Sequence, residues 1–366
     1  MSDVKFRCER DVLVEALGIA SRAVSGRASL PGLSGIRAEL QGDQLTLTGS
    51  DLDLTISTRI TVSGESDGVS VIPARLASDI VRAVQPGAVS FAAEAESLTI
   101  RAGRSEFSIR LISGDEFPQL AALDADPVQL QSEQLAAALK QVVLAASNDD
   151  SRPILTGVLL QAEGGGLRLV ATDSYRLAMR DLADVSVLDE GKNVLMPSRA
   201  LGELNRILAQ ADEVNVRLGH NEASFEVGPV TLVTRLIEGD FPNYRGLIPE
   251  MHPNTLTVNR EELLDALRRV KLLARESTPI KIEMSDDGME LVAVTQDVGT
   301  ARESLESSYE GSALTVAFNP QYLLEGVEVA PGEEITLATI DELKPAVVRA
   351  VGVDDYLYLL MPVRVS

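Results

Sequence analysis

The sequence contains one cysteine, two histidines and no tryptophan among its 366 residues. The single cysteine, Cys8, excludes an internal disulfide and a zinc site built from several cysteines. The two histidines, His220 and His252, leave little material for a metal centre, so we expect neither a metal nor a cofactor. The apolar runs, such as Tyr356–Val363, fall far short of the roughly 20 residues that span a bilayer. The first ten residues lack the apolar segment of a secretory signal, and we therefore expect a cytoplasmic protein.

Positive charge is also scarce. The chain has 33 Lys and Arg against 55 Asp and Glu, a net charge of −22. This excludes a surface that is basic all over, although a local basic stripe stays possible. A hydrophobic content of 45% and a charged content of 24% are ordinary for a globular protein and exclude a disordered or collagen-like chain. The length predicts two or three domains.

The chain contains one pattern three times. Each third opens with a helical motif, continues with a strand pair, and then has a strand ending in proline that is followed by an amphipathic helix. The corresponding positions are Leu17, Leu139 and Leu267 (122 and 128 apart), Asp51, Asp173 and Thr295 (122 and 122 apart), and Pro73, Pro197 and Pro320 (124 and 123 apart). A fourth motif, RLI followed by an acidic segment and proline, places Pro118 and Pro242 124 residues apart. A period near 122 residues is a whole domain rather than a solenoid unit.

The hydrophobic periodicity predicts two helices and many short strands in each repeat. The expected helices are 9–24, 74–84, 132–146, 198–210, 260–275 and 320–328. Ser132 and Asn259 are typical helix-capping residues, while Gly164–Gly166 and Asp286–Gly288 are typical of hairpin turns. The order of elements predicts an α+β fold in which each repeat is a doubled βαβββ unit, with antiparallel sheets outside and two helices inside. We expect the domains to be residues 1–125, 126–252 and 253–366.

Four segments, taken together, resemble one family closely: the bacterial DNA polymerase III beta subunit, or sliding clamp. They are RPILTG from Arg152, ATDSYRLA from Ala171, EGDFPNYR from Glu238 and MPVR from Met361. The likeness covers the whole chain. It implies a head-to-tail homodimer whose six domains form a closed ring, with helices around a hole that holds double-stranded DNA without sequence specificity. It further implies a non-catalytic, nucleoid-associated protein that tethers the replicative polymerase, the clamp loader and repair proteins through short linear motifs.

The distribution of charge agrees with this expectation. The six predicted helices carry 12 Lys and Arg against 11 Asp and Glu, so the rest of the chain has a net charge of −23. Surface helices also carry basic residues simply to balance their own acids, which is the alternative explanation. The helix 320–328 has Glu325 and Glu328 and no basic residue, so its part in DNA contact is open. The candidate DNA-facing residues are Arg75, Arg82, Lys140, Arg199, Arg206, Arg268, Arg269, Lys271 and Arg275, to which the resemblance adds Arg27.

The resemblance also implies a peptide-binding groove and a dimer interface. The groove residues are Arg152, Leu155, Thr172, Ser174, Tyr175, Arg176, Leu177, Pro242, Arg245, Leu247, Leu359, Leu360, Met361, Pro362, Val363 and Arg364. Ser174 and Tyr175 stand where the family often has glycine and histidine, and Val365-Ser366 extends the tail. At the dimer interface, Phe107 and Ile109 are expected to pack on Leu272 and Leu273 of the second chain. The alternatives are that the groove residues seal a domain junction and that the interface residues belong to the core.

Catalytic motifs are not evident in the sequence. Asp173 and Ser174 could be combined with His220 as parts of a hydrolase, but the equivalent Asp51 has no such companions, so a structural turn role fits both aspartates better. The acidic pairs Asp149-Asp150 and Asp354-Asp355 are typical of solvated turns rather than of metal ligands. The alternative to a clamp is a three-domain hydrolase or carbohydrate-active enzyme that arose by domain triplication.

Overall fold

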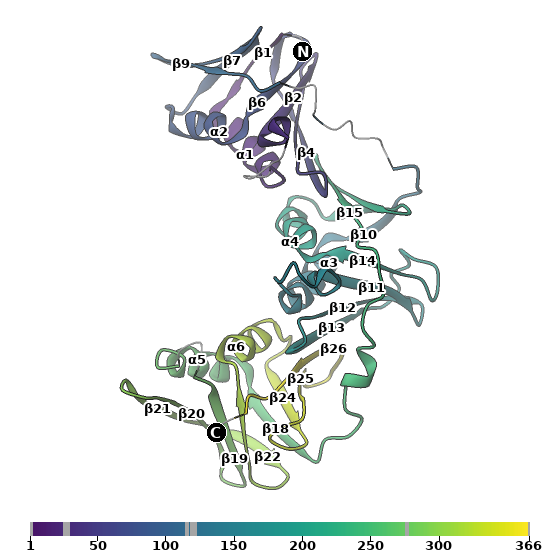
Figure 1. Cartoon of the computed structure of the whole chain (residues 1–366), viewed down its shortest axis with the longest axis vertical. Coiled ribbons are helices and arrows are strands. Elements are labelled where there is room, and N and C mark those ends of the chain that lie inside the picture. Colours follow the sequence, from purple (N-terminus) through teal and green to yellow (C-terminus); the bar gives the residue numbers. More distant parts are fainter. Residues whose placement is uncertain (1–2, 25–29, 114–116, 118–122, 275–277, 365–366) are drawn as a thin grey trace. The chain divides into compact units, whose positions relative to one another are not determined.

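The computed structural model describes residues 3–24, 30–113, 117, 123–274 and 278–364 (Figure 1). The described residues form helices and antiparallel sheets that repeat the same order of elements three times. None of the helices among them is long and apolar enough to cross a membrane.

The first repeat contains two βαβββ units. The first unit is β1 (Val4–Glu9), α1 (Arg10–Ser21), β2 (Gly35–Gln41), β3 (Gln44–Ser50) and β4 (Leu54–Thr61). The second unit is β6 (Gly68–Pro73), α2 (Ala74–Ala83), β7 (Ala88–Glu94), β8 (Ser97–Ala102) and β9 (Ser105–Arg110), and the short strand β5 (Ser63–Ser66) lies between the units.

The second repeat has the same order. Its first unit is β10 (Val128–Gln131), α3 (Ser132–Val142), β11 (Gly157–Glu163), β12 (Gly166–Thr172) and β13 (Arg176–Leu182). Its second unit is β14 (Asn193–Pro197), α4 (Ser198–Ile207), β15 (Glu213–Leu218), β16 (Glu222–Val227) and β17 (Val230–Arg235).

The third repeat again contains two units and one extra strand, β22 (Ser307–Glu310). Its first unit is β18 (Asn254–Asn259), α5 (Arg260–Val270), β19 (Ile280–Ser285), β20 (Gly288–Thr295) and β21 (Gly299–Leu305). Its second unit is β23 (Leu314–Phe318), α6 (Pro320–Val329), β24 (Glu334–Thr339), β25 (Ala346–Ala350) and β26 (Val353–Leu360). The predicted doubled βαβββ unit is thus confirmed in all three repeats.

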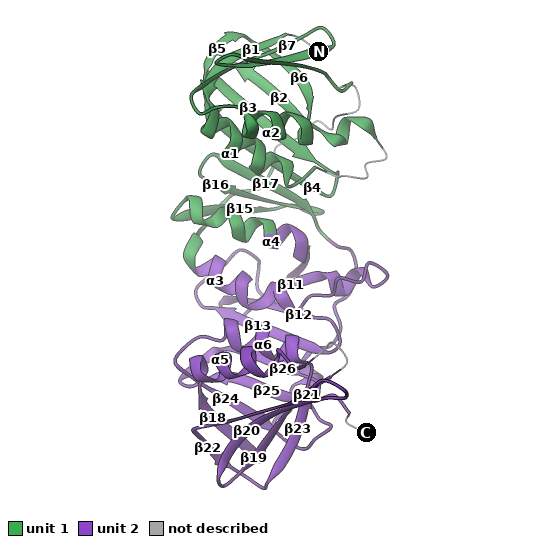
Figure 2. Ribbon diagram, turned by 90° about the vertical axis from the view of Figure 1, so that its left-hand side faces the viewer, with its two compact units in different colours: residues 1–133, 203–236 green, residues 134–202, 237–366 purple. Residues whose placement is uncertain are grey.

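Strands from neighbouring repeats join into shared sheets. β4 pairs with β17 in an eight-stranded sheet, and β13 pairs with β26 in a nine-stranded sheet. A five-stranded sheet ends at β9, and a four-stranded sheet ends at β21. Because the shared sheets cross the repeats, the chain divides into two compact units rather than three (Figure 2): unit 1 is residues 1–133 with 203–236, and unit 2 is residues 134–202 with 237–366. The predicted domain limits stay predictions.

The helices begin and end for local reasons. The Asn259 side chain accepts a hydrogen bond from the Glu262 backbone N–H and caps α5, as expected, with acidic residues in the first turn and arginines in the last. The expectation for Ser132 is wrong: this residue is the first of α3, and its buried hydroxyl has no hydrogen-bond partner. Gln131 is the last residue of β10, so Ser132 lies in the first turn of the helix rather than before it.

The structure also corrects the alignment of the third repeat. Pro73 and Pro197 are the last residues of their strands, whereas Pro320 is the first residue of α6. Asn319 therefore takes the place of the two prolines, and its side chain accepts hydrogen bonds from the backbone of Gln321 and Tyr322. With this one-residue shift, Gln321, Glu325 and Glu328 occupy the helix positions of Arg75, Asp79 and Arg82 in α2.

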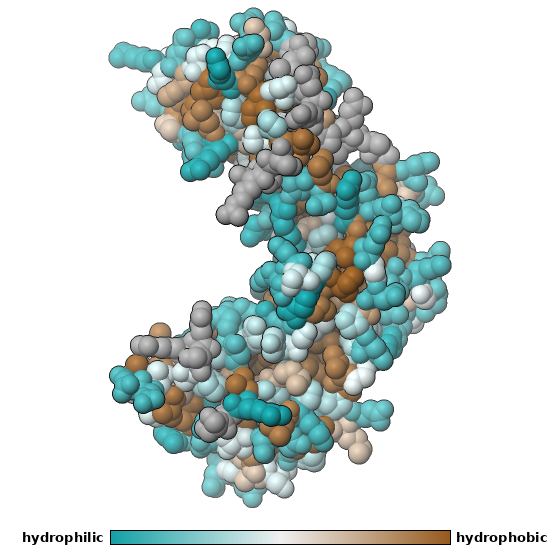
Figure 3. Space-filling model, in the orientation of Figure 1, coloured by the Kyte–Doolittle hydropathy of each residue, from teal (hydrophilic) through white to brown (hydrophobic). Residues whose placement is uncertain are grey.

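Each unit has its own apolar core. In unit 1, α1 and α2 lie side by side against strands β1–β4 and β6 (Figure 1), and Phe6 stacks on Phe91 with ring centroids 4.7 Å apart. In unit 2, α5 and α6 are neighbours, and Gly326 lies so close to the Tyr358 ring that a β-carbon would come within 2.2 Å of it. Glycine is required at this contact. The face of the molecule shown in Figure 3 is mostly hydrophilic, with apolar patches between the polar side chains.

Candidate functional site

Two aspartates build the same tight turn in two repeats. The Oδ1 atom of Asp51 accepts hydrogen bonds from the Asp53 and Leu54 N–H groups, at 3.1 and 2.8 Å. The Oδ1 atom of Asp173 accepts them from Tyr175 and Arg176, at 2.8 and 3.0 Å. The structural turn role predicted for both aspartates is confirmed. Asp173 is buried and committed to this turn, so it is not available as part of a hydrolytic site.

The turn at Asp173 has a strained residue at its tip. Ser174 has a φ of 81°, a left-handed conformation that costs a non-glycine residue roughly 1–2 kcal/mol. Leu52, in the equivalent place of the Asp51 turn, has a φ of 82°. The strain explains why glycine suits this position, where the chain has serine. Tyr175 follows, 59% exposed, and its carbonyl accepts a hydrogen bond from the Met361 N–H at 2.8 Å.

Arg176 lies beneath this turn and is buried. Its Nε donates to Asp173 Oδ2 at 3.0 Å, and its Nη1 donates to Glu325 of α6. The guanidinium also stacks on the Tyr322 ring, 4.2 Å from the centroid. Burial by itself lowers the pKa of Arg176, but its interactions with Tyr358 and Glu325 raise it more, so the net shift is upward. Arg176 therefore joins the turn to α6, and the expectation that it would hold a ligand directly is not supported by this geometry.

The groove residues of β13, β12 and the C-terminal strand form one hydrogen-bonded cluster. Arg176 and Leu177 pair with Leu360 and Leu359, and the Thr172 hydroxyl donates to the Arg176 carbonyl at 2.7 Å. Leu177, Leu359 and Leu360 are almost fully buried, so they form the floor of this region rather than its contact surface. The exposed apolar atoms belong to Met361, Val363, Tyr175 and Leu247.

Arg152 contacts the turn, and Leu155 follows Arg152 in the chain. Arg152 Nη1 lies 3.4 Å from the Ser174 hydroxyl oxygen, and its Nε forms an ion pair with Asp149 at 2.9 Å. Leu155 is half-buried in a short 3₁₀ helix, Pro153–Thr156. Asp149 also accepts hydrogen bonds from Ser151, and these, together with Arg152, lower its pKa. This matches the predicted solvated turn.

The segment around residues 241–247 belongs to the same part of unit 2. Tyr244 is buried in an apolar cluster with Leu177 and Leu359, against which Ile154 and Phe241 pack. The Arg245 side chain forms an ion pair with Glu163 of β11. The structure thus brings together most of the predicted groove residues. Three other predicted groove residues, Pro242, Leu247 and Arg364, are exposed, and Pro362 is half-buried. We define the candidate peptide surface as the exposed residues Ser174, Tyr175, Leu247, Met361 and Val363 together with the half-buried Arg152 and Leu155.

The basic residues of α2 and α4 follow one pattern. Arg75 and Arg82 lie two helical turns apart on either side of Asp79, and Arg199 and Arg206 flank Glu203 in the same way. The Arg75 side chain is 97% exposed and that of Arg82 is 61% exposed, and their contacts with Asp79 are loose, at 3.9 and 3.5 Å. Arg206 is likewise exposed and lies 2.7 Å from Glu203. Ion pairs of this kind stabilise a helix by roughly 0.3–0.5 kcal/mol and yield readily to a phosphate.

The basic residues of the third repeat contact side chains of neighbouring elements. Arg268 contacts Asp265 and, at 3.2 Å, Glu328 of α6. Arg269 pairs with Glu303 of β21, and Lys271 Nζ donates to the Gln321 side chain. Lys140 of α3 is exposed. Two of the candidates, Arg27 and Arg275, lie outside the described residues.

The acidic residues of α6 are explained by the arginines with which they form ion pairs. Glu325 pairs with Arg176, and Glu328 pairs with Arg268, so both acids are balanced by arginines of unit 2. Sequence reasoning missed the role of Glu325 because its partner lies 149 residues away. The signal that could have found it is positional: Glu325 corresponds to Asp79 and Glu203, which also face arginines.

Two of the predicted interface residues lie on β9, the edge strand of the five-stranded sheet, and the other two directly follow α5. Phe107 is 37% exposed and Ile109 is half-buried on β9. Leu272, which follows α5, is 84% exposed, and Leu273 is half-buried. The exposure of Phe107 and Leu272 argues against the alternative that all four are core residues.

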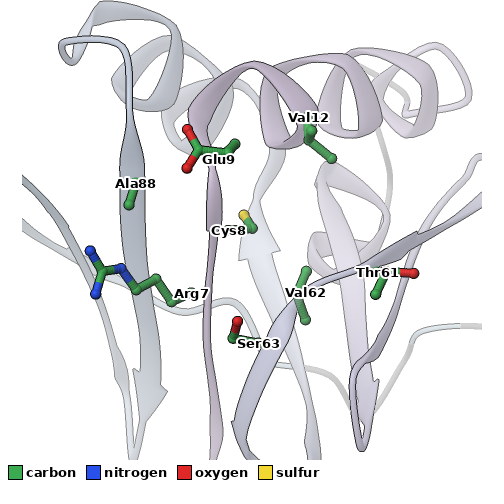
Figure 4. Close-up of a pocket in the computed structure, with 8 residues that line it drawn as sticks. All are labelled: Arg7, Cys8, Glu9, Val12, Thr61, Val62, Ser63 and Ala88. Atoms are coloured by element: carbon green, nitrogen blue, oxygen red, sulfur yellow. The ribbon is translucent and has the colours of Figure 1, made fainter.

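A cavity of about 540 Å³ lies in unit 1 (Figure 4). The residues that line it are not among the predicted DNA-facing, groove or interface residues. Arg7, Cys8 and Glu9 of β1 and Val12 of α1 are among the residues that line it. Burial, with Glu9 nearby, raises the pKa of the Cys8 thiol to about 11. A thiol that stays protonated at neutral pH is a poor nucleophile, which fits a structural residue. Among the described residues, no group of three His, Cys, Asp or Glu side chains could hold a metal ion.

Comparison with known proteins decides among the expectations. Three family models match the chain in order: the N-terminal domain of the DNA polymerase III beta subunit at residues 4–121, the central domain at 129–243 and the C-terminal domain at 245–364. The chain belongs to the DNA polymerase III beta subunit family.

Individual relatives of this family cover the whole chain. The chain is 32% identical to the "Beta sliding clamp" of Staphylococcus aureus over 377 residues, covering 99% of both chains. It is 30% identical to that of Streptomyces coelicolor over 380 residues, covering 99% of this chain and 100% of the other. The crystal structure of the Bacillus subtilis sliding clamp matches with a TM-score of 0.92 at 30% identity over 100% of both chains. A Bartonella birtlesii clamp bound to griselimycin matches with a TM-score of 0.91 at 28% identity, covering 99% of this chain and 100% of that one.

Membership of the beta subunit family fixes the general function. The protein is a sliding clamp, the non-catalytic processivity subunit of DNA polymerase III, and acts with DNA and the polymerase. The alternative of a triplicated hydrolase or carbohydrate-active enzyme is wrong.

Proposed function

We propose that two copies of this clamp close into a ring by pairing β21 of one chain with β9 of the other. The third strand after the first helix is equivalent in the three repeats (β4, β13 and β21). The last strand of each repeat is likewise equivalent in all three (β9, β17 and β26). β4 pairs with β17 and β13 with β26 within the chain, while β9 and β21 each end a sheet with one described neighbour. An exposed edge strand is a template for pairing, and one β9 and one β21 per chain close a twofold dimer.

The repeat also predicts the register of this pairing. Gly103 and Gly228 hold the same hairpin position, with φ values of 56° and 55°, so Phe107 corresponds to Leu232, which pairs with Ile56 of β4. On the other strand, Ile56 pairs with Gly49 and Ala301 pairs with Ala293. Gly49 and Ala293 are 244 residues apart, which is two periods of 122. Their partners, Ile56 and Ala301, therefore hold the same position in two repeats. We therefore expect Phe107 opposite Ala301 of the second chain, and Ser108 opposite Thr300.

Engineered cysteines test this register. The variant with Ser108→Cys and Thr300→Cys, in a Cys8→Ser background, should form a disulfide-linked dimer on mild oxidation, because opposed residues of antiparallel strands lie about 4.5–5.5 Å apart. The matched control, Ser108→Cys with Ala301→Cys, is shifted by one residue and points its second cysteine to the opposite face. Equal crosslinking of both variants, or none in the first, would contradict the pairing.

We further propose that the helices hold duplex DNA through phosphate contacts alone. The support is the pattern of α2 and α4, whose exposed arginines repeat at the same places in two domains. Contacts to phosphates position DNA without reading its sequence, and the acidic remainder of the chain disfavours binding elsewhere. Contacts are expected from the exposed basic residues of α2, α3 and α4, which are Arg75, Arg82, Lys140, Arg199 and Arg206. From this role we propose that the protein acts at the nucleoid, in the cytoplasm.

The candidate peptide surface is proposed to bind short linear motifs of the polymerase, the clamp loader and repair proteins. Met361, Leu247 and Leu155 offer apolar contact to a leucine or phenylalanine side chain, and methionine adapts to ligands of different shape. Arg152 and the exposed Arg364 supply a polar rim. Griselimycin is bound to the Bartonella birtlesii relative, which supports ligand binding by this fold without assigning its place here.

A truncation tests the peptide surface. Leu360 is 1% exposed and pairs with Arg176, so the cut must come after it to spare the fold. Removal of residues 362–366 should weaken binding of a fluorescent polymerase-derived peptide at least about tenfold, which corresponds to roughly 1.4 kcal/mol. The melting temperature and the dimer should not change, and Val351→Ala, another exposed apolar position in unit 2, serves as the control. Unchanged peptide affinity in the truncated protein would place the binding surface elsewhere.

A further inference from the structure

A chain of polar side chains runs from α5 to the Asp173 turn within unit 2. Lys271 Nζ donates to Gln321 Oε1, and Gln321 Nε2 donates to Glu325 Oε1. The second carboxylate oxygen of Glu325 accepts from Arg176 Nη1. Arg176 Nε in turn donates to Asp173 Oδ2 at 3.0 Å. One end of this chain is a proposed DNA-facing lysine, and the other end is the carboxylate that shapes the turn of the candidate peptide surface.

The inner members of the chain depend on one another because they are buried. Arg176 and Asp173 are each less than a tenth exposed, and a buried charge that loses a partner is strongly destabilised. Asp173 alone balances Arg176 only in part, since the guanidinium extends past it to α6. Glu325 is the second acid, and the distance along the chain between it and Arg176 shows that it ties two separate elements together.

The turn held by this network carries two residues of the candidate peptide surface. Asp173 Oδ1 accepts the Tyr175 and Arg176 N–H groups, which fixes the strained backbone of Ser174 and the direction of Tyr175. The Tyr175 carbonyl then receives the Met361 N–H at 2.8 Å. Hydrogen bonds thus link Arg176, the Asp173 turn and Met361.

We infer that Glu325 is a positioning residue for the peptide-binding turn, and that Gln321 links it to Lys271 so that DNA and peptide binding are coupled. This inference rests on the peptide surface and the DNA contacts proposed above. A phosphate that draws Lys271 away removes the donor that orients the Gln321 amide toward Glu325. Glu325 then holds Arg176 less firmly, the turn is less ordered, and the peptide binds more weakly on DNA. By linkage, bound peptide weakens DNA binding by the same factor.

The first test measures the affinity of a fluorescent polymerase-derived peptide for the full-length dimer without DNA. Glu325→Gln keeps the size and hydrogen-bonding capacity of the side chain but removes its charge, and should weaken peptide binding about three- to tenfold. Glu328→Gln is the matched control, because it lies on the same helix, pairs with Arg268 instead, and should change the affinity less than about twofold. Hydrogen exchange should show faster exchange of the Tyr175 and Arg176 amides in Glu325→Gln alone.

The second test repeats the peptide titration with a saturating short duplex. The wild-type protein should bind the peptide about two- to fivefold more weakly on DNA, as expected for the loss of one exposed charge-assisted hydrogen bond. Gln321→Ala and Lys271→Met break the link without touching Arg176, and their peptide affinities should be equal with and without DNA. If Glu325→Gln binds and exchanges like the wild type, the positioning role is wrong. If Gln321→Ala keeps the full effect of DNA, the coupling route is wrong.

These outcomes differ from a failure of the proposed function. Wild-type protein that does not bind the peptide, or that binds it unchanged after removal of residues 362–366, would refute the peptide surface itself. Wild-type binding that is lost on truncation but insensitive to Glu325→Gln would refute only the inference about α6.

Discussion

Shortening the Leu272 side chain to alanine should break the ring without unfolding the chain. Leu272 is 84% exposed in the isolated chain, so almost the whole side chain is available for burial against a second copy. Leu272→Ala removes about three carbon atoms, worth about 2 kcal/mol at roughly 0.8 kcal/mol for each buried group. A twofold dimer contains this contact twice, so the loss doubles to about 4 kcal/mol. The dissociation constant of the dimer should rise about a thousandfold.

The assay is mass photometry or analytical ultracentrifugation across a concentration series, with thermal melting of each variant as the folding check. Because the side chain is exposed in the single chain, its loss should change the stability of the protomer by less than about 0.5 kcal/mol. Leu343→Ala is the control, since Leu343 is an exposed leucine of unit 2, at 51%, but lies between β24 and β25. A Leu272→Ala dimer whose dissociation constant is within about threefold of the wild-type value, or equals that of the Leu343→Ala control, would refute the assignment of Leu272 to the interface.

Three further predictions concern DNA contact, strain and the thiol. Replacing Arg82 and Arg206 by Ala removes four cations per ring, so the logarithmic salt slope of DNA binding should fall by about 3 to 4 while the dimer persists; an unchanged slope would place DNA elsewhere. Leu52→Gly should raise the stability of the fold by about 1 kcal/mol by relieving the φ of 82°, whereas Leu52→Ala, which keeps that strain, should not; equal unfolding midpoints for the two variants would remove strain as the explanation. The folded-state pKa of Cys8, raised to about 11 from 9.0, keeps the thiol protonated, so thiol reagents at pH 8 should react far faster with unfolded than with folded protein. Because the unfolded thiol ionises first, Cys8 should also cost stability as the pH rises from 9 to 11, and stability that is flat or rising over that range in comparison with Cys8→Ser would contradict the shift.

Much of the fold could be predicted because the chain repeats its own pattern. The helix faces were readable from spacing: Leu263, Leu264, Leu267 and Val270 recur at helical intervals and are all buried. The hairpin at Gly164–Gly166 was readable because two successive residues with positive φ favour glycine. What the repeat could not show is how strands pair between repeats. β4 with β17 and β13 with β26 are long-range pairings with no local signal, and they are why the compact units differ from the predicted domains.

The sequence could predict which residues of the candidate site lie in one part of the fold, but not which of them are exposed. A motif names Arg176, Leu177 and Leu360, but it does not tell an exposed side chain from a buried one. The structure places all three beneath the surface and leaves Met361, Leu247 and Tyr175 exposed. Arg176 was the least predictable, because its function depends on Glu325, which belongs to another helix and was read only as an unfavourable charge near DNA.

The most direct measurement of the clamp function uses topology. The protein is loaded onto a nicked circular duplex by its clamp loader, and retention is measured by gel filtration before and after the circle is cut once. A ring that encircles DNA without reading it should stay on the intact circle, leave after linearisation, and stay again when the ends are blocked. The Leu272→Ala variant should not be retained on the circle. Equal retention on circular and unblocked linear DNA would show that the protein grips DNA directly, and would contradict the clamp.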